Sequence, residues 1–132
     1  MKKTCNKGIL SVILIATFVI CCFGRGSVYA SVRGDITGTL KEKSVSGKLT
    51  CNEAWHHLTI VLNYKTRSTL TGESTSHTTS NDTFGNNTAV TKYVSTGVHE
   101  SASFLNVIGK VDNTVKKNFN VTSYGTSTRE YW

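Results

Sequence analysis

Alternation at every second position dominates one segment of this sequence, "AWHHLTIVLNY", residues 54–64. Successive side chains of an extended chain point to opposite faces, so such a segment buries one face and leaves the other in water. The even-numbered face carries Ala54, His56, Leu58, Ile60, Leu62 and Tyr64. We therefore expect a strand over residues 54–64, with the flanking aromatic residues Trp55 and Tyr64 in the core.

The rest of the chain after residue 30 repeats this pattern more weakly and shows no apolar repeat at helical spacing. It holds 18 threonines and 12 serines, lacks proline, and has glycines near most of the breaks, which suits strands joined by polar turns. Further strands are expected over residues 36–41, 45–51, 89–95, 102–111 and 114–122. Since a parallel sheet would need crossover helices, the pattern predicts an all-β domain, a small antiparallel β-sandwich or barrel of about six or seven strands.

Residues 66–88, "TRSTLTGESTSHTTSNDTFGNNT", contain only Leu70 and Phe84 as large apolar residues. This polarity is compatible with a long mobile loop or with a solvated hairpin. Threonine favours strands, and long bare loops are uncommon in compact domains. We therefore favour the hairpin.

The first thirty residues have the organisation of an export signal. Three lysines precede the uncharged run of residues 8–24, which ends before the next basic residue. Val28 and Ala30 have the small-x-small spacing that precedes a signal-peptidase site. We expect residues 1–30 to be a signal helix, either cleaved after Ala30 or retained as a membrane anchor, and residues 31–132 to form a single secreted β-domain.

Charge limits the partners of this domain. The whole chain has a formal charge of +7, but four of its basic residues lie in the export signal, which leaves eleven basic and eight acidic residues, or +3. No basic stripe interleaved with aromatic residues occurs, as nucleic-acid recognition would require. The expected partner is an envelope polymer, a membrane surface or a protein, and not a nucleic acid.

The segment "CNEAWHH", residues 51–57, gathers the one cysteine of the exported domain and two adjacent histidines. In a strand, Cys51 and His57 would lie roughly 20 Å apart, too far for a nucleophile and its base unless a turn shortens the distance. His56 and His57 would point to opposite faces and could not easily share a metal ion. We expect Cys51 to be a small buried thiol without a disulfide partner, and neither a metal nor a cofactor.

The other motifs in the chain do not indicate a recognition site or a catalytic site. "RGD", residues 33–35, resembles the integrin-binding tripeptide, but three residues match by chance, and we expect a polar lead-in with a turn glycine before the first strand. The acidic residues are scattered, and no GxSxG, SxxK or HExxH pattern occurs. These features favour a domain that is not an enzyme.

Aromatic and basic side chains near the C-terminus supply the candidate binding surface. These residues are Lys116, Lys117, Tyr124, Tyr131 and Trp132. Aromatic faces stack on sugars and lie well at membrane interfaces, while adjacent lysines attract anionic groups. The terminal "REYW" is compatible with a strand that closes over the core and with an exposed contact.

The expected function is therefore binding of a cell-surface or envelope component by an exported, non-enzymatic β-domain. A secreted antagonist of the bacteriocin kind is the first alternative, because "GVHESASF", residues 97–104, and the aromatic C-terminus are loosely similar to exported lactococcin-type bacteriocins. A small secreted hydrolase that uses Cys51 or a histidine is the second.

Overall fold

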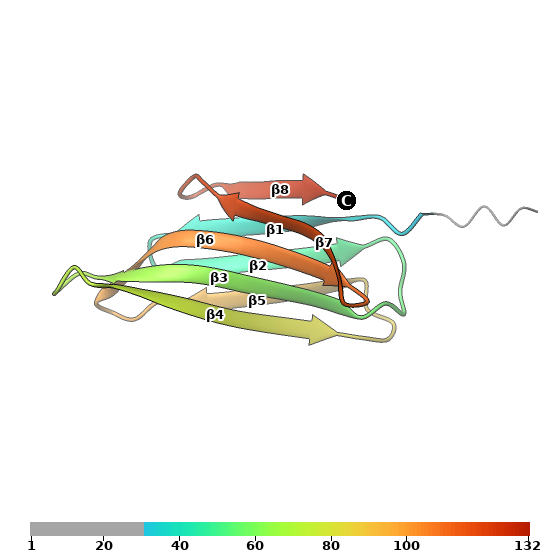
Figure 1. The fold of residues 1–132 in the computed structure, drawn as a ribbon, viewed down its shortest axis with the longest axis horizontal. Helices are drawn as coiled ribbons and strands as arrows, with labels where there is room; N and C mark the ends of the chain where they lie inside the picture. Colours follow the sequence, from blue (N-terminus) through green and yellow to red (C-terminus); the bar gives the residue numbers. More distant parts are fainter. Residues whose placement is uncertain (1–30) are drawn as a thin grey trace, which may run out of the picture. The chain divides into compact units, whose positions relative to one another are not determined.

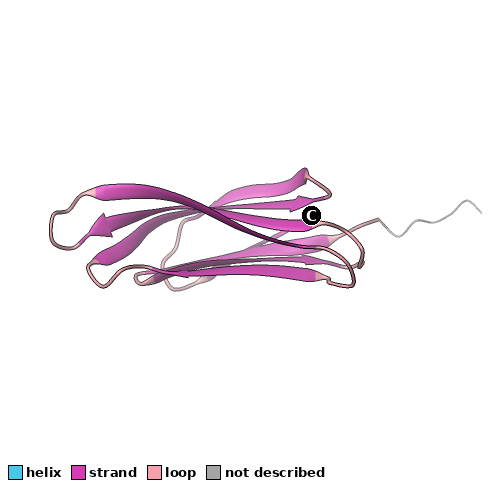
Figure 2. Cartoon of the chain, turned by 90° about the horizontal axis from the view of Figure 1, so that it is seen from below, coloured by secondary structure: helices cyan, strands magenta, loops and turns pink. Residues whose placement is uncertain are grey.

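The computed structural model describes residues 31–132, which form eight β-strands and no helix (Figures 1 and 2). The strands are β1 (Gly34–Lys41), β2 (Ser44–Cys51), β3 (Leu58–Ser68), β4 (Ser74–Thr83), β5 (Ala89–Ser95), β6 (Glu100–Val111), β7 (Thr114–Val121) and β8 (Ser127–Tyr131). Within this range no helix is long and apolar enough to cross a membrane. The expected signal helix and its cleavage site fall in residues 1–30, outside the described residues.

Two four-stranded sheets make up the two layers of the domain. The first sheet has the strand order β5-β2-β1-β8 and the second has the order β4-β3-β6-β7. Every neighbouring pair is antiparallel. Figure 2 shows the two layers edge-on. The all-β antiparallel prediction is confirmed, in its sandwich form.

Short polar turns join the hairpins within each layer. β6 and β7 are connected by Asp112 and Asn113, which have φ values of 50° and 65°. A two-residue turn with positive φ at both positions matches the twist of the flanking strands, and Asp and Asn adopt this conformation more readily than most residues. The hairpin brings Asp112 next to residues 52–57, since the N–H of Asp112 donates to the carbonyl of His57 at 2.8 Å.

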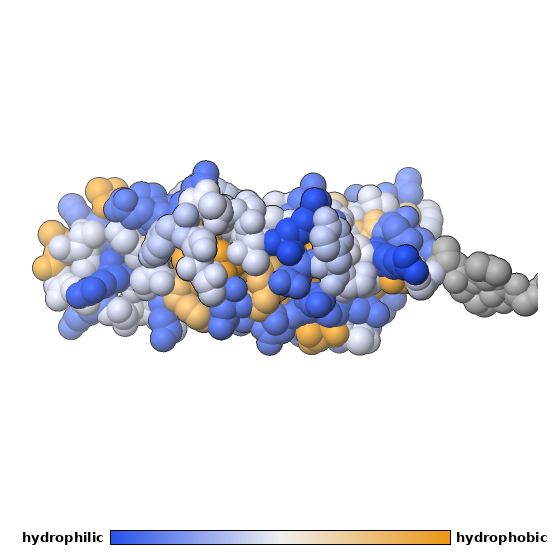
Figure 3. All heavy atoms as spheres, turned by 90° about the horizontal axis from the view of Figure 1, so that it is seen from above, coloured by the Kyte–Doolittle hydropathy of each residue, from blue (hydrophilic) through white to orange (hydrophobic). Residues whose placement is uncertain are grey.

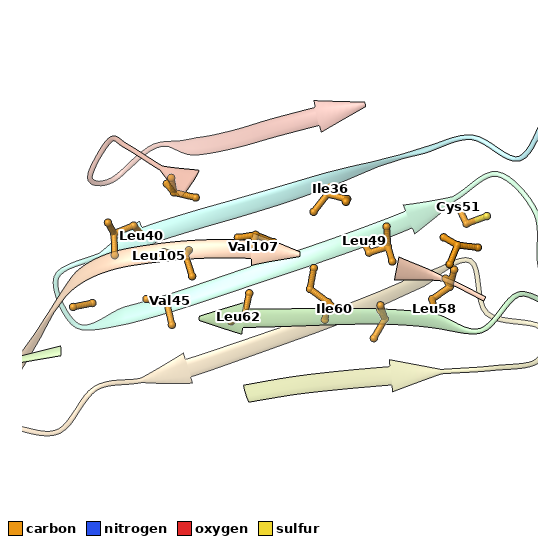
Figure 4. Packing of buried hydrophobic residues seen from close by; sticks show 14 residues of the cluster. Ile36, Leu40, Val45, Leu49, Cys51, Leu58, Ile60, Leu62, Leu105 and Val107 are labelled. Carbon is orange, nitrogen blue, oxygen red and sulfur yellow. The ribbon is translucent and has the colours of Figure 1, made fainter. Parts of the chain in front are cut away.

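Alternation along the strands builds the core between the sheets (Figure 4). Leu58, Ile60 and Leu62 of β3 are fully buried, as the sequence predicts, and burying each such side chain stabilises the fold by about 1.5–3 kcal/mol. The other buried apolar residues are Ile36, Leu40, Val45, Leu49, Cys51, Val90, Ala102, Leu105, Val107, Val111 and Val121. These residues come from β1, β2, β3, β5, β6 and β7, so the described residues form a core between their own two sheets.

The outward-facing positions of both layers are mostly polar. Figure 3 shows one side of the molecule, on which hydrophilic and intermediate residues cover most of the surface and hydrophobic residues form small separate groups. This distribution is the expected counterpart of a core built by alternation.

The strand predicted over residues 54–64 begins later than expected. Residues 54–57 form a loop, in which Trp55 has a φ of 69° and its N–H donates to the carbonyl of Gly85 at 2.7 Å. The backbone therefore leaves the sheet here, and Trp55 is 68% exposed. The prediction of a core Trp55 is wrong, whereas Tyr64 does pack against the margin of the core.

The number of strands also exceeds the expected six or seven. The hairpin favoured for residues 66–88 is confirmed, with β4 as its second arm. β8 is not among the strands expected from alternation, because "STREY" has no alternation of apolar residues, although a closing strand is one of the two possibilities for "REYW". Its hydrogen bonds to β1, rather than burial of its side chains, define it as a strand.

Candidate binding face of the first sheet

The outer face of the first sheet is lined at its centre by short hydroxyl side chains and two cations. They surround a shallow groove of about 460 Å³, which we name the hydroxyl groove; its lining residues are Thr37, Thr39, Ser46, Gly47, Lys48, Ser127 and Arg129. Such a groove offers hydrogen-bond donors and acceptors together with positive charge.

Strand register brings these side chains together from β1, β2 and β8. Thr39 lies opposite Ser46 on one side and Ser127 on the other, and the hydroxyls of Thr39 and Ser127 share a hydrogen bond of 2.7 Å. The next row along β1 consists of Lys48, Thr37 and Arg129. The neighbouring residues on β1 and β2 point into the core, so alternation fixes the polar side chains outside.

The two cations of the groove differ in their surroundings. Arg129 Nε donates to Asp35 Oδ2 at 2.8 Å. Burial alone would raise the pKa of Asp35, but hydrogen bonds from Thr50 and Arg129, together with the positive charge of Arg129, outweigh it and hold this pKa below its usual value. Lys48 makes no ion pair with any described residue.

Two exposed tyrosines lie on the outer face beyond the groove, one on each edge strand. Tyr93 of β5 lies opposite Ser46 and is 62% exposed, and Tyr131 of β8 lies opposite Asp35 and is 67% exposed. The guanidinium carbon of Arg129 lies 5.5 Å from the centre of the Tyr131 ring. Aromatic rings of this kind stack on the apolar faces of sugars.

The tripeptide "RGD" opens β1 instead of forming a turn before it. The N–H of Gly34 donates to the carbonyl of Trp132 at 3.1 Å, as a strand residue does. The carboxylate of Asp35 is bonded within the sheet to Thr50 and Arg129. The expected turn glycine is therefore wrong, and the carboxylate is not presented as a free recognition group.

The five residues of the binding surface expected from the sequence do not all lie together in the structure. Lys116 Nζ lies 5.5 Å from the centre of the Trp132 ring, so these two residues do meet. Lys117 Nζ lies 3.8 Å from the carboxylate of Glu130, between the edge strands β7 and β8. Trp132 is half-buried against the core, and its indole N–H is buried without a hydrogen-bond partner among the described residues.

The other two candidate residues lie elsewhere. Tyr131 points outward from β8 on the face that carries the hydroxyl groove, since its neighbour Trp132 packs inward. Tyr124 bridges to Leu40 at the far end of β1, and its hydroxyl donates to the carbonyl of Ala102. Of the five residues, only Tyr131 borders the groove.

The histidines of residues 51–57 each pair with a carboxylate. His56 Nδ1 lies 2.6 Å from Asp112 Oδ2, and this hydrogen bond raises the pKa of His56. His57 Nε2 lies 3.0 Å from Asp82 Oδ2. Among the described residues no group of His, Cys, Asp and Glu is arranged to hold a metal ion. Cys51 is a free, buried thiol, as predicted.

The groove itself was missed at the sequence level. Its residues are separated by up to about ninety positions, and alternation says only that each points outward. The signal present in the sequence is a polar side chain at every second position, two hydroxyls in "TGT", residues 37–39, and a hydroxyl and a cation in "STR", residues 127–129. These side chains form one surface only because β2, β1 and β8 are neighbouring strands of the same sheet.

Comparisons of this chain with protein-family models, curated proteins and solved structures found no match.

Proposed function

We propose that this protein is an exported, non-enzymatic β-domain that binds an anionic glycan or glycan-like polymer of the cell envelope through the hydroxyl groove. The observation that carries the proposal is the combination of hydroxyl rows with an unpaired Lys48 in one shallow groove. Sugars present many hydroxyls, and an anionic substituent would contribute the charge that Lys48 and Arg129 attract.

The two tyrosines support an extended ligand over a small molecule. Tyr93 and Tyr131 lie on opposite edge strands of the same sheet, with the groove between them. A polymer crossing the four strands would pass both rings and the groove. The groove is open and shallow, whereas pockets for small ligands enclose most of their occupant.

Binding to immobilised polymers tests the proposal. Residues 31–132 are expected to be retained on isolated cell walls and on a sulfated glycan such as heparin, and to be released by salt, because exposed charges are screened. Neutral dextran, as a matched probe, is expected to retain much less protein. The Lys48→Ala change is expected to weaken binding about fivefold, since a single exposed ionic contact is worth ~1 kcal/mol.

The matched control is Lys110→Ala, which removes the same charge from the outer face of the second sheet. This variant is expected to bind like the parent protein. Equal losses in both variants would show that net charge, and not the groove, governs retention. No retention on any of the charged polymers would refute the proposed function.

A further inference from the structure

We propose that one end of the domain, the aromatic tip, binds the headgroup interface of a lipid bilayer. The aromatic tip consists of the loop of residues 52–57 and the loop of residues 84–88, with Trp55 and Phe84 as its projecting side chains. It is distinct from the hydroxyl groove and does not depend on the function proposed for that groove.

Both aromatic side chains of the tip face solvent. Trp55 is 68% and Phe84 is 64% exposed. They come from loops that touch directly, since the N–H of Trp55 donates to the carbonyl of Gly85, the residue after Phe84. Burial in the core would be the default for such large apolar rings, so two exposed rings on adjoining loops indicate a contact surface.

The backbone at Trp55 adopts a strained conformation in the loop that exposes the indole. Its φ of 69° lies in the left-handed region, which is uncommon for a bulky residue. A strained residue of this kind persists only where its surroundings fix it, and such residues concentrate at functional sites. The strain therefore points to a role for the projecting indole.

Several interactions fix the loop that carries Trp55. His56 and His57 bind Asp112 and Asp82, from the β6–β7 turn and from β4 respectively. At the start of the loop, Asn52 exchanges hydrogen bonds with the backbone of Arg33, at 2.7 and 2.8 Å. The aromatic tip is thus pre-organised, which lowers the conformational entropy lost on binding.

The contact with Arg33 places the start of the described domain beside the tip. The domain begins at this end, and residues 1–30 with the apolar run 8–24 precede it in the sequence. If that run is retained in a bilayer as an anchor, the chain tethers the domain at its first residues, next to the loop of residues 52–57. Trp and other aromatic rings favour the water–bilayer interface, where an apolar ring and a polar edge are both satisfied.

Charge selects the lipid class. The ionisable groups of the two loops and of the residues that they bind are the carboxylates of Glu53, Asp82 and Asp112, the imidazoles of His56 and His57, and Arg33. This is a nearly neutral to acidic set at neutral pH, so an anionic bilayer would not attract it. The tip fits a zwitterionic headgroup layer, into which the rings insert while the acids stay in water.

Vesicle binding tests the proposal. Residues 31–132, which form a core between their own two sheets, are expected to co-sediment with phosphatidylcholine vesicles and to show a blue shift of tryptophan emission. Trp55→Ala and Phe84→Ala are each expected to reduce the vesicle-bound fraction, with the double change lowering the apparent affinity more than tenfold. Unchanged thermal unfolding of the variants will show that they fold, since both side chains are exposed.

The matched control lies at the other end of the domain. Leu70, in the β3–β4 turn, is 73% exposed, and Leu70→Ala is expected to leave vesicle binding unchanged. Equal losses in this variant would show general hydrophobic adsorption and overturn the proposal. So would absent vesicle binding, or full binding by the Trp55→Ala Phe84→Ala protein. Retention of the Lys48→Ala protein on lipid-free polymer reports on the groove alone, so the two proposals fail independently.

Discussion

At the scale of single residues, close approach of the two sheets requires glycine at several inward-facing positions. A Cβ placed on Gly38 of β1 would lie 2.6 Å from a methyl group of Val107 and 2.7 Å from one of Val121. Both neighbours are fully or nearly fully buried valines, whose short branched side chains cannot move aside easily. Gly38 therefore allows the two sheets to approach closely at this point.

The Gly38→Ala change is therefore expected to destabilise the domain by about 1–3 kcal/mol, the usual range for overpacking a core. Thermal or denaturant unfolding of residues 31–132 measures this loss. Gly97→Ala is the control, because its added Cβ would meet Glu100 only at 3.4 Å, and φ there is not positive. A Gly38→Ala protein as stable as the parent would mean that the sheets can move slightly apart at this point without a loss of stability.

At the scale of elements, the loop of residues 52–57 is held to the rest of the domain by groups that titrate. The hydrogen bond and charge of Asp112 raise the pKa of His56 above its ordinary value of 6.5. The same hydrogen bond, with one from the backbone of His57, lowers the pKa of Asp112 below 3.8. Each partner therefore favours the charged form of the other, so the hold on the loop depends on pH.

Stability follows from the direction of these shifts. A raised pKa means that the contribution of His56 is fully present below pH 6.5, the unfolded value, and is lost as pH rises through the folded pKa. His56→Gln is expected to be less stable than the parent near about pH 5, by at most ~1 kcal/mol because the pair is partly exposed, and equal to it near about pH 8.5. Thermal unfolding across this range measures the difference.

The control for this titration is His99→Gln in the β5–β6 connection. The side chain of His99 makes no ion pair with any described residue. Its variant is expected to keep the pH profile of the parent. A constant difference between His56→Gln and the parent at all pH values would show that the imidazole acts by packing and not by charge.

The strands also show which features of the fold can be predicted from the sequence. Alternation located the core face of β3 correctly, because burial of one face leaves its mark on every second residue. It extended that strand too far, into Trp55, because the hydrogen bond to Gly85 that turns the backbone away comes from a distant loop. The hydroxyl groove depends on β8 pairing with β1, and no local pattern of "STREY" predicts this pairing.

At the scale of the whole domain, the four edge strands need protection from pairing with other chains. Asn81 Nδ2 donates to the carbonyl of Thr91 at 2.8 Å and so links β4 to β5 across one side of the sandwich. On the other side, the ion pair of Lys117 and Glu130 links β7 to β8. These bridges connect the two sheets along both open sides.

β8 is itself an edge strand, and it covers the backbone of β1. Removing residues 127–132 would leave the N–H and C=O groups of Asp35–Thr39 unpaired along that side and would remove Trp132 from the margin of the core. We expect the shortened protein to lose about 2 kcal/mol or more of stability, mainly through Trp132, and to associate as its concentration rises. Thermal unfolding and light scattering during size-exclusion chromatography measure the two effects. Glu130→Gln removes the ion pair but keeps the strand, and is expected to elute like the parent; a shortened protein that does the same would show that β1 needs no cover.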